Sequence, residues 1–138
     1  MSKTKIAING FGRIGRNAFK IAFERTDLEI VAINDLTDNA TLAYLLKHDS
    51  NYGTYGHDVS SDDQGIVVNG QHIKVLAEKD PAALPWKDLG VELVIESTGF
   101  FTDKEGASKH VQAGAKRVVI SGPTKSDGVA TIVLGASD

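Results

Sequence analysis

Short apolar runs alternate with amphipathic segments along the chain, an alternation typical of an α/β fold. The segment Leu28–Ile33 is mostly apolar, as expected for a parallel strand covered on both faces. Similar runs predict strands at 5–9, 91–96, 118–120 and 131–134. The pattern therefore predicts one Rossmann-type domain over residues 1–138, built on a doubly wound, mostly parallel sheet.

Apolar positions with helical spacing lie between these strands. After the first strand they recur at i, i+4, i+7 and i+8, at Ile14, Ala18, Ile21 and Ala22. Residues 39–47 predict a second, shorter helix. Thr102 and Glu105 have capping-box spacing and predict a third helix. We expect that helix to end near Ala113, with Gly114 as its left-handed stop.

The segment between the second helix and the strand at 91–96 has a different pattern. Two apolar arms, 66–68 and 72–75, flank Asn69-Gly70, and Asn-Gly is the strongest short-range signal for a hairpin. We therefore expect an antiparallel hairpin inserted at the edge of the sheet. The polar, glycine-containing segment His48–Asp63 predicts a long loop, and residues 81–86 predict a turn-rich connection with a short helical piece.

The most informative motif follows the first strand. Gly10-Phe11-Gly12-Arg13-Ile14-Gly15 joins that strand to a helix, and Asp35 lies twenty residues beyond Gly15. This arrangement is the fingerprint of a dinucleotide-binding βαβ unit. Gly10 permits the turn, Gly12 lets a pyrophosphate approach the backbone, and Gly15 lets the helix pack closely on the sheet. The helix N-terminus would face the anion, and Asp35 would accept hydrogen bonds from a ribose 2′-hydroxyl.

Several polar and glycine residues follow strands of the predicted sheet. They are Gly10, Asp35, Ser97-Thr98-Gly99 and Ser121-Gly122. Because ligands of open α/β sheets bind at the carboxyl ends of the strands, we expect these residues to lie around one site. A carboxylate at Asp35 would repel a 2′-phosphate, which favours NAD over NADP as the cofactor.

Composition and charge exclude several other functions. The 138 residues carry a net charge of −3, which argues against the usual basic surface for nucleic acid. No apolar run is long enough to span a membrane, and no apolar secretory segment precedes the first strand, so a cytoplasmic location is expected. The four histidines lack metal-site spacing, and both they and Glu96 are predicted to be structural. With no cysteine, the chain has no disulfide and no thiolate nucleophile.

Several segments resemble the NAD-binding, N-terminal half of phosphorylating glyceraldehyde-3-phosphate dehydrogenase, in the same order and over almost the whole chain. They are Ala7–Arg16, Val31–Asp35, Tyr44–Ser50, Ala77–Pro81, Ser97–Phe101 and Gly114–Ser121. Within the first of them, Asn-Gly-Phe-Gly-Arg-Ile-Gly is far more specific than the glycine pattern alone. The resemblance implies a Rossmann fold, NAD as cofactor and a role in glycolysis.

The resemblance also implies a role for individual residues along the cofactor. Arg13 and Ile14 would present backbone amides to the pyrophosphate, and Asp35 would hold the adenosine ribose. Lys79 stands where the family usually has an arginine whose backbone contacts the adenine side. This exchange should matter little if the contact is made by the backbone.

At the other end of the cofactor, Thr98 and Gly99 would line the groove, and Ser121 would lie near the nicotinamide. Members of the resembled family are homotetramers, so the resemblance implies a homo-oligomer. Tyr52 and Tyr55, in the predicted long loop, are candidates for such a contact.

The chain departs from the family in its catalytic residues. The family's nucleophilic cysteine lies in a Ser-Cys-Thr-Thr-Asn motif soon after the position that corresponds to Asp138, and its base histidine and phosphate-binding residues lie further on. We therefore expect no catalytic residue here and no activity of the chain by itself, since the thiolate must attack the aldehyde first. The aldehyde phosphate and phosphate would bind only to the full-length parent. Two alternatives are the N-terminal domain of erythrose-4-phosphate dehydrogenase and a stand-alone, non-catalytic NAD-binding module.

Overall fold

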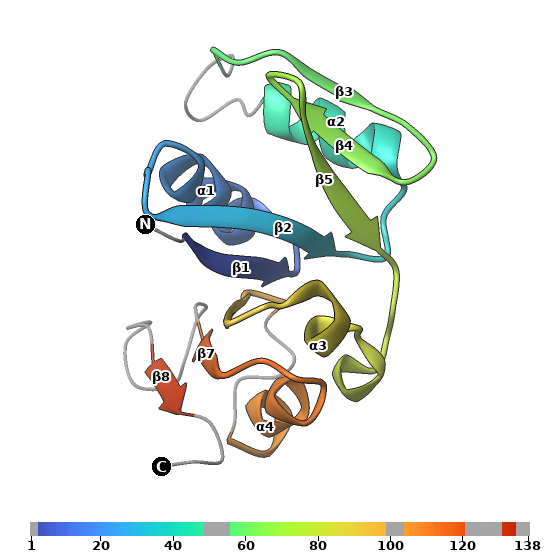
Figure 1. The fold of residues 1–138 in the computed structure, drawn as a ribbon. Coiled ribbons are helices and arrows are strands. Elements are labelled where there is room, and N and C mark those ends of the chain that lie inside the picture. Colours follow the sequence, from blue (N-terminus) through green and yellow to red (C-terminus); the bar gives the residue numbers. More distant parts are fainter. Residues whose placement is uncertain (1–2, 49–55, 99–103, 121–130, 135–138) are drawn as a thin grey trace.

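The computed structural model describes residues 3–48, 56–98, 104–120 and 131–134. These residues form one eight-stranded sheet with the order β3-β4-β5-β2-β1-β6-β7-β8 (Figure 1). The strands are β1 (Thr4–Asn9), β2 (Leu28–Asn34), β3 (Val59–Ser61), β4 (Gly65–Val68), β5 (Gln71–Leu76), β6 (Leu93–Glu96), β7 (Arg117–Ile120) and β8 (Thr131–Leu134). The α-helices are α1 (Arg13–Phe23), α2 (Asn39–Lys47), α3 (Trp86–Leu89) and α4 (Lys104–Gln112), and a 3₁₀ turn covers Pro81–Ala83.

The centre of the sheet is parallel and its two edges are antiparallel. Strands β5, β2, β1, β6 and β7 pair in parallel, whereas β3 and β4 at one edge and β8 at the other pair antiparallel. The chain runs outward from β1 through β2 to β5 and then returns to β6 on the other side of β1. This reversal is the switch point at which open α/β sheets bind their ligands. The predicted mostly parallel Rossmann-type sheet is confirmed.

The predicted hairpin is confirmed, with two differences. Its second arm, β5, also pairs in parallel with β2, so the hairpin is joined to the centre of the sheet as well as to its edge. Within the predicted loop 48–63, residues 59–61 form β3, which pairs with β4. The prediction of a loop was wrong for these three residues. Val59-Ser60-Ser61 is too short and polar to show a strand pattern, and it becomes a strand only because β4 offers an unpaired edge.

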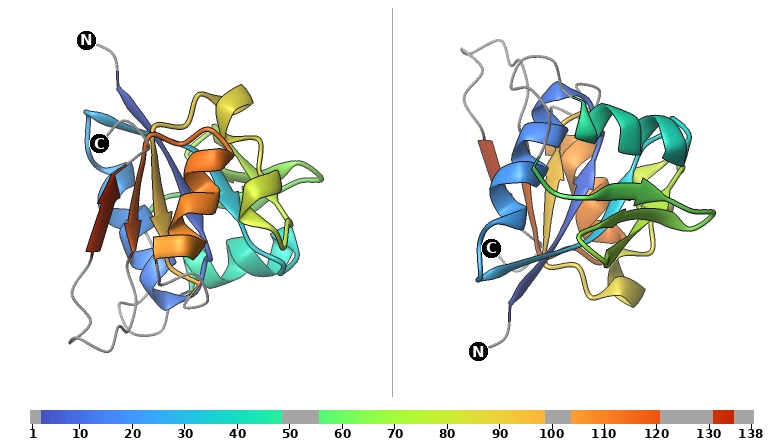
Figure 2. Two further views of the ribbon diagram at one scale, coloured as in Figure 1. Left: turned by 90° about the horizontal axis from the view of Figure 1, so that it is seen from below. Right: turned by 90° about the horizontal axis from the view of Figure 1, so that it is seen from above.

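Helices cover both faces of the sheet, as Figures 1 and 2 show. Ile6 and Ile8 of β1 pack with α1 and α2 in one core cluster, whereas Ala7 points to the opposite face. That second face packs against Trp86 of α3 and Val111 of α4. Both faces of β1 are therefore covered from Ile6 onward, which explains the apolar run Ile6-Ala7-Ile8.

The ends of the helices follow local sequence signals. Helix α1 begins directly after Gly12, as predicted. Helix α2 begins after Asp38, whose carboxylate accepts hydrogen bonds from the Thr41 amide (3.0 Å) and the Thr41 hydroxyl (2.8 Å). Gly114 has a φ of 121° and stops α4 as expected. The capping threonine predicted for α4, Thr102, lies outside the described residues.

Over the described part of the chain, no helix combines the length and apolar character needed to cross a membrane.

Replacing Asp38 by alanine tests the cap of α2. The Thr41 hydroxyl, and then its amide, hold the pKa of Asp38 below its usual value. The ionised carboxylate therefore stabilises the folded chain above about pH 4, and this contribution is lost as the pH falls through the lowered pKa. We expect Asp38→Ala to lower the Tm at neutral pH, by an amount that shrinks below about pH 4. Thermal unfolding at several pH values measures this difference, and a difference that grows on acidification would contradict the assignment.

Candidate functional site

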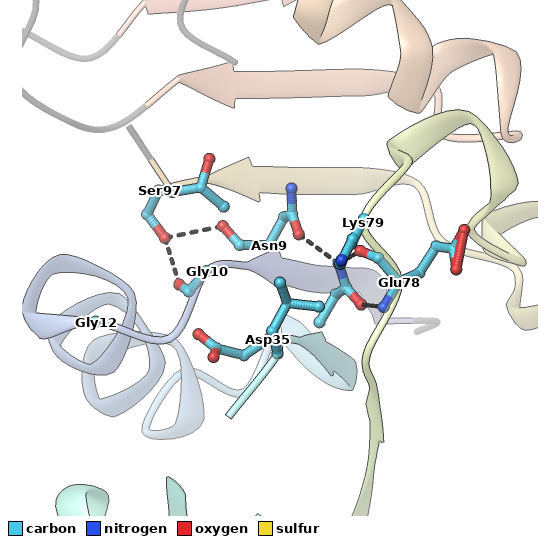
Figure 3. A pocket seen from close by; sticks show the side chains of 10 residues that line it. Asn9, Gly10, Gly12, Asp35, Glu78, Lys79 and Ser97 are labelled. Carbon is cyan, nitrogen blue, oxygen red and sulfur yellow. Dashed lines mark hydrogen bonds between the residues drawn. The ribbon is translucent and has the colours of Figure 1, made fainter. Parts of the chain in front are cut away.

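A pocket of about 430 Å³ opens at the carboxyl ends of the central parallel strands (Figure 3). Each lining residue ends or closely follows β1, β2, β5 or β6. They are Asn9, Gly10, Gly12, Asn34, Asp35, Leu36, Glu78, Lys79, Ser97 and Thr98. The pocket therefore lies at the carboxyl edge of the sheet, the edge at which we expected a ligand, and the strand order adds that this is beside the switch point between β1 and β6.

The floor of the pocket is a close backbone contact between β1, α1 and the end of β6. A Cβ atom on Gly15 would collide with the Gly10 carbonyl oxygen and lie 2.9 Å from the Ser97 Oγ. Gly10 has a φ of 95°, and a Cβ there would lie 2.7 Å from the Thr98 Cγ2. Both glycines are thus required by the packing, in the roles the motif predicted.

Packing does not require a glycine at position 12. A Cβ built on it has no atom within 4 Å, and its backbone conformation (φ −77°) suits any residue. Gly12 nevertheless lines the pocket and is the N-cap of α1. Its missing side chain leaves open the space in front of the helix N-terminus, where an anion can approach the backbone.

Asp35 joins the end of β2 to the glycine loop. Its Oδ2 accepts a hydrogen bond from the Phe11 amide at 2.7 Å, and its Oδ1 accepts one from the Thr37 amide at 2.9 Å. A carboxylate oxygen can accept two hydrogen bonds, so each oxygen keeps one acceptor position after these contacts. Asp35 is only partly buried, and those positions can therefore serve a ligand's hydroxyl groups.

The wall that carries Lys79 is held by Asn34. The Asn34 side chain donates to the Glu78 carbonyl and accepts from the Glu78 amide, both at 2.9 Å. This two-way contact fixes the chain just after β5 against the end of β2. The Lys79 side chain itself is exposed.

A buried acid, Glu96, contacts two of the residues that line the pocket, Asn9 and Thr98. Glu96, the last residue of β6, is 1% exposed and accepts hydrogen bonds from Asn9 (2.6 Å) and His110 (2.7 Å) through Oε1. Its Oε2 accepts from the Thr98 amide (3.0 Å) and the Thr98 hydroxyl (2.6 Å). These donors satisfy both oxygens of the buried carboxylate.

The structure gathers many of the predicted site residues but not all of them. Gly10, Gly12, Asp35, Lys79 and Thr98 line the pocket. Arg13 and Ile14, which open α1, and the buried Gly15 are not among the lining residues. Gly99 and Ser121 lie outside the described residues.

Sequence reasoning missed Asn9, Asn34, Leu36 and Glu78 as pocket residues, whereas Ser97 lines the pocket as expected. Their signal was position, since each ends a parallel strand or lies within two residues of its end. No group of side chains suited to a metal ion occurs in the described part of the chain.

A glycine loop at a helix N-terminus and an acid at the end of the second strand, both at the switch point, define a dinucleotide-binding Rossmann domain. Comparison with known proteins identifies its family. Residues 4–104 match the family model described as "Glyceraldehyde 3-phosphate dehydrogenase, NAD binding domain". The chain therefore belongs to this family and is an NAD-binding domain.

Curated relatives extend the match to almost the whole chain. Glyceraldehyde-3-phosphate dehydrogenase 1 of Bacillus cereus is 55% identical over 134 residues, 97% of this chain and 40% of the relative. The enzyme of that name from Borreliella burgdorferi is 59% identical over 139 residues, 97% of this chain and 41% of the relative. The one from Geobacillus stearothermophilus is 53% identical, over 96% of this chain and 39% of the relative. The chain spans about two fifths of the length of these relatives.

Two glycine substitutions separate packing from ligand access. Gly15→Ala places a methyl group against the Gly10 carbonyl, and we expect it to destabilise the fold by about 1–3 kcal/mol despite alanine's better helix propensity. Gly12→Ala meets open space, so its stability should stay within about 0.5 kcal/mol while NAD binding weakens. Chemical unfolding and calorimetric titration with NAD measure the two effects. Unchanged NAD affinity in Gly12→Ala would show that the cofactor does not approach this loop.

Proposed function

We propose that NAD binds along the carboxyl edge of the sheet, with its pyrophosphate at the N-terminus of α1. Gly10, Gly12 and Gly15 shape the loop, and the backbone amides of Arg13 and Ile14 donate hydrogen bonds to the phosphate oxygens. The open space in front of Gly12 supports this placement.

The adenosine and nicotinamide ends follow from the same placement. Asp35 accepts hydrogen bonds from the adenosine ribose, and the backbone of Lys79 borders the adenine. Thr98, with Gly99, lines the groove toward the nicotinamide, and Ser121 lies near the nicotinamide. The observation that most strongly supports this placement is the hydrogen bond from the Phe11 amide to Asp35. It joins the acid and the glycine loop into one wall of the pocket.

We further propose that the chain, as one domain over residues 1–138, supplies the cofactor site of a cytoplasmic, homotetrameric phosphorylating glyceraldehyde-3-phosphate dehydrogenase. The parent reaction oxidises an aldehyde phosphate, transfers hydride to NAD and releases the acyl group to phosphate. The names of the relatives support this activity. The chain has no cysteine, so by itself it binds the cofactor without catalysing the reaction. Neither the erythrose-4-phosphate enzyme nor a stand-alone module is favoured by any of these observations.

Calorimetric titration of the chain with NAD and, separately, with NADP tests the cofactor site. We expect NAD to bind at least about tenfold more tightly, because the Asp35 carboxylate repels a 2′-phosphate. In Asp35→Asn the amide oxygen can still accept from Phe11 while the charge is gone, so the ratio of the two affinities should fall toward one. A ratio that is the same in both proteins would remove Asp35 from the ribose site.

A further inference from the structure

Buried polar side chains form a continuous relay beneath the pocket, from α3 through α4 to the ends of β6 and β1. The Trp86 Nε1 donates to the His110 Nδ1 at 3.0 Å, and the His110 Nε2 lies 2.7 Å from the Glu96 Oε1. The same oxygen accepts from Asn9 at 2.6 Å. Trp86, His110 and Glu96 are at most 1% exposed.

The direction of each hydrogen bond in this relay is fixed. The indole Nε1 is only a donor, so the His110 Nδ1 must accept and carries no proton. A histidine must then carry its proton on Nε2, from which it donates to Glu96. The imidazole of His110 is therefore neutral, and its Nε2–H donates a hydrogen bond to a buried carboxylate.

The relay ends on two residues that line the pocket. Glu96 Oε1 holds the side chain of Asn9, and Glu96 Oε2 holds both the amide and the hydroxyl of Thr98. Both residues line the pocket: Asn9 directly precedes Gly10 in the chain, and Thr98 packs so closely against Gly10 that no room remains for a Cβ. One buried anion thus sets the position of two walls of the same site.

We propose that Glu96 is a positioning residue for the cofactor, and that His110 acts on the pocket through it. This inference rests on the proposed cofactor site. Glu96 touches no cofactor; it holds Thr98 and Asn9 in the arrangement that the dinucleotide meets, and Trp86 and His110 hold Glu96. A carboxylate is needed here because His110, Asn9 and Thr98 all donate hydrogen bonds to it, and only a carboxylate accepts through both of its oxygens.

Glu96→Gln tests this proposal with almost no change in shape. Oε1 faces two N–H donors, so the glutamine turns its NH₂ group toward Thr98, where the hydroxyl can accept but the amide loses its hydrogen bond to residue 96. We expect NAD affinity to fall about tenfold, because binding must then restore the arrangement of Thr98 that a buried hydrogen bond otherwise holds in place. Hydrogen exchange of the Thr98 amide should become faster in the ligand-free chain.

Val118→Ala is the matched control for stability. Val118 is fully buried in β7 and takes no part in the relay, so its truncation destabilises the same face of the sheet by leaving a cavity. We expect it to lower the Tm but to leave NAD affinity within twofold, well below its unfolding temperature. An equal loss of affinity in Val118→Ala and Glu96→Gln at matched loss of Tm would overturn the positioning role.

Two variants of His110 keep the proposal testable if Glu96→Gln does not fold. Glutamine can place an amide N–H where the His110 Nε2 lies, so His110→Gln should restore the bond to Glu96 and retain most of the affinity. Asparagine is shorter: its side-chain oxygen can accept from Trp86, but its NH₂ group does not reach Glu96. Glu96 then lacks one donor, so His110→Asn should bind NAD several-fold more weakly. Equal affinity of the two variants would overturn the relay.

Failure of this inference differs from failure of the proposed site. If the unsubstituted chain binds NAD and Glu96→Gln binds it equally well, the positioning role is wrong and the site stands. If the unsubstituted chain does not bind NAD, the proposed site fails and the inference fails with it.

Discussion

The backbone of Gly10 is the point on which the sheet, the first helix and the pocket depend. Its amide donates to the carbonyl of Asn34 at the end of β2, and its carbonyl accepts from the hydroxyl of Ser97 just after β6. Gly15 of α1 packs directly on the same carbonyl. Three neighbouring elements are thus held within contact distance of one residue without a side chain. This close approach fixes where α1 begins and leaves the pocket in front of its N-terminus.

A change from apolar to polar residues along the strands creates the edge at which the pocket lies. The middles of β1, β2 and β6 are apolar, whereas each ends on a buried polar residue: Asn9, Asn34 and Glu96. Asn34 donates to Asn9 at 2.7 Å and Asn9 donates to Glu96 at 2.6 Å, so the three strand ends satisfy one another across the sheet. Buried polar groups are costly unless they are paired, and a fully paired set holds its members in one arrangement. The pocket therefore has a rigid polar rim on an apolar core.

Much of this architecture could be predicted from the sequence, because the signals are local. Two-sided burial makes the strands continuous apolar runs, and the glycines and Asp35 occur at the spacing that the dinucleotide loop requires. Strand β3 could not be predicted, because Val59-Ser60-Ser61 has no strand-like hydrophobic pattern of its own and depends on β4 for pairing. The order of the strands also had no local signal.

The contacts that complete the site could not be predicted, because they join residues far apart in the chain. Asn34 and Glu78 are 44 positions apart, and Asn9 and Glu96 are 87 apart. A lone histidine on α4 and an acid at the end of β6 each looked structural, and both are indeed buried. Only their meeting beneath Thr98 gives them a connection to the pocket, and that meeting depends on β6 lying beside β1.

A crystal structure of the chain with NAD is the first measurement to make, because it shows directly where the cofactor lies. We expect the pyrophosphate at the N-terminus of α1 in front of Gly12, the adenosine ribose on Asp35 and the nicotinamide half running past Thr98. A dinucleotide bound away from this edge, or one whose ribose hydroxyls make no contact with Asp35, would contradict this placement.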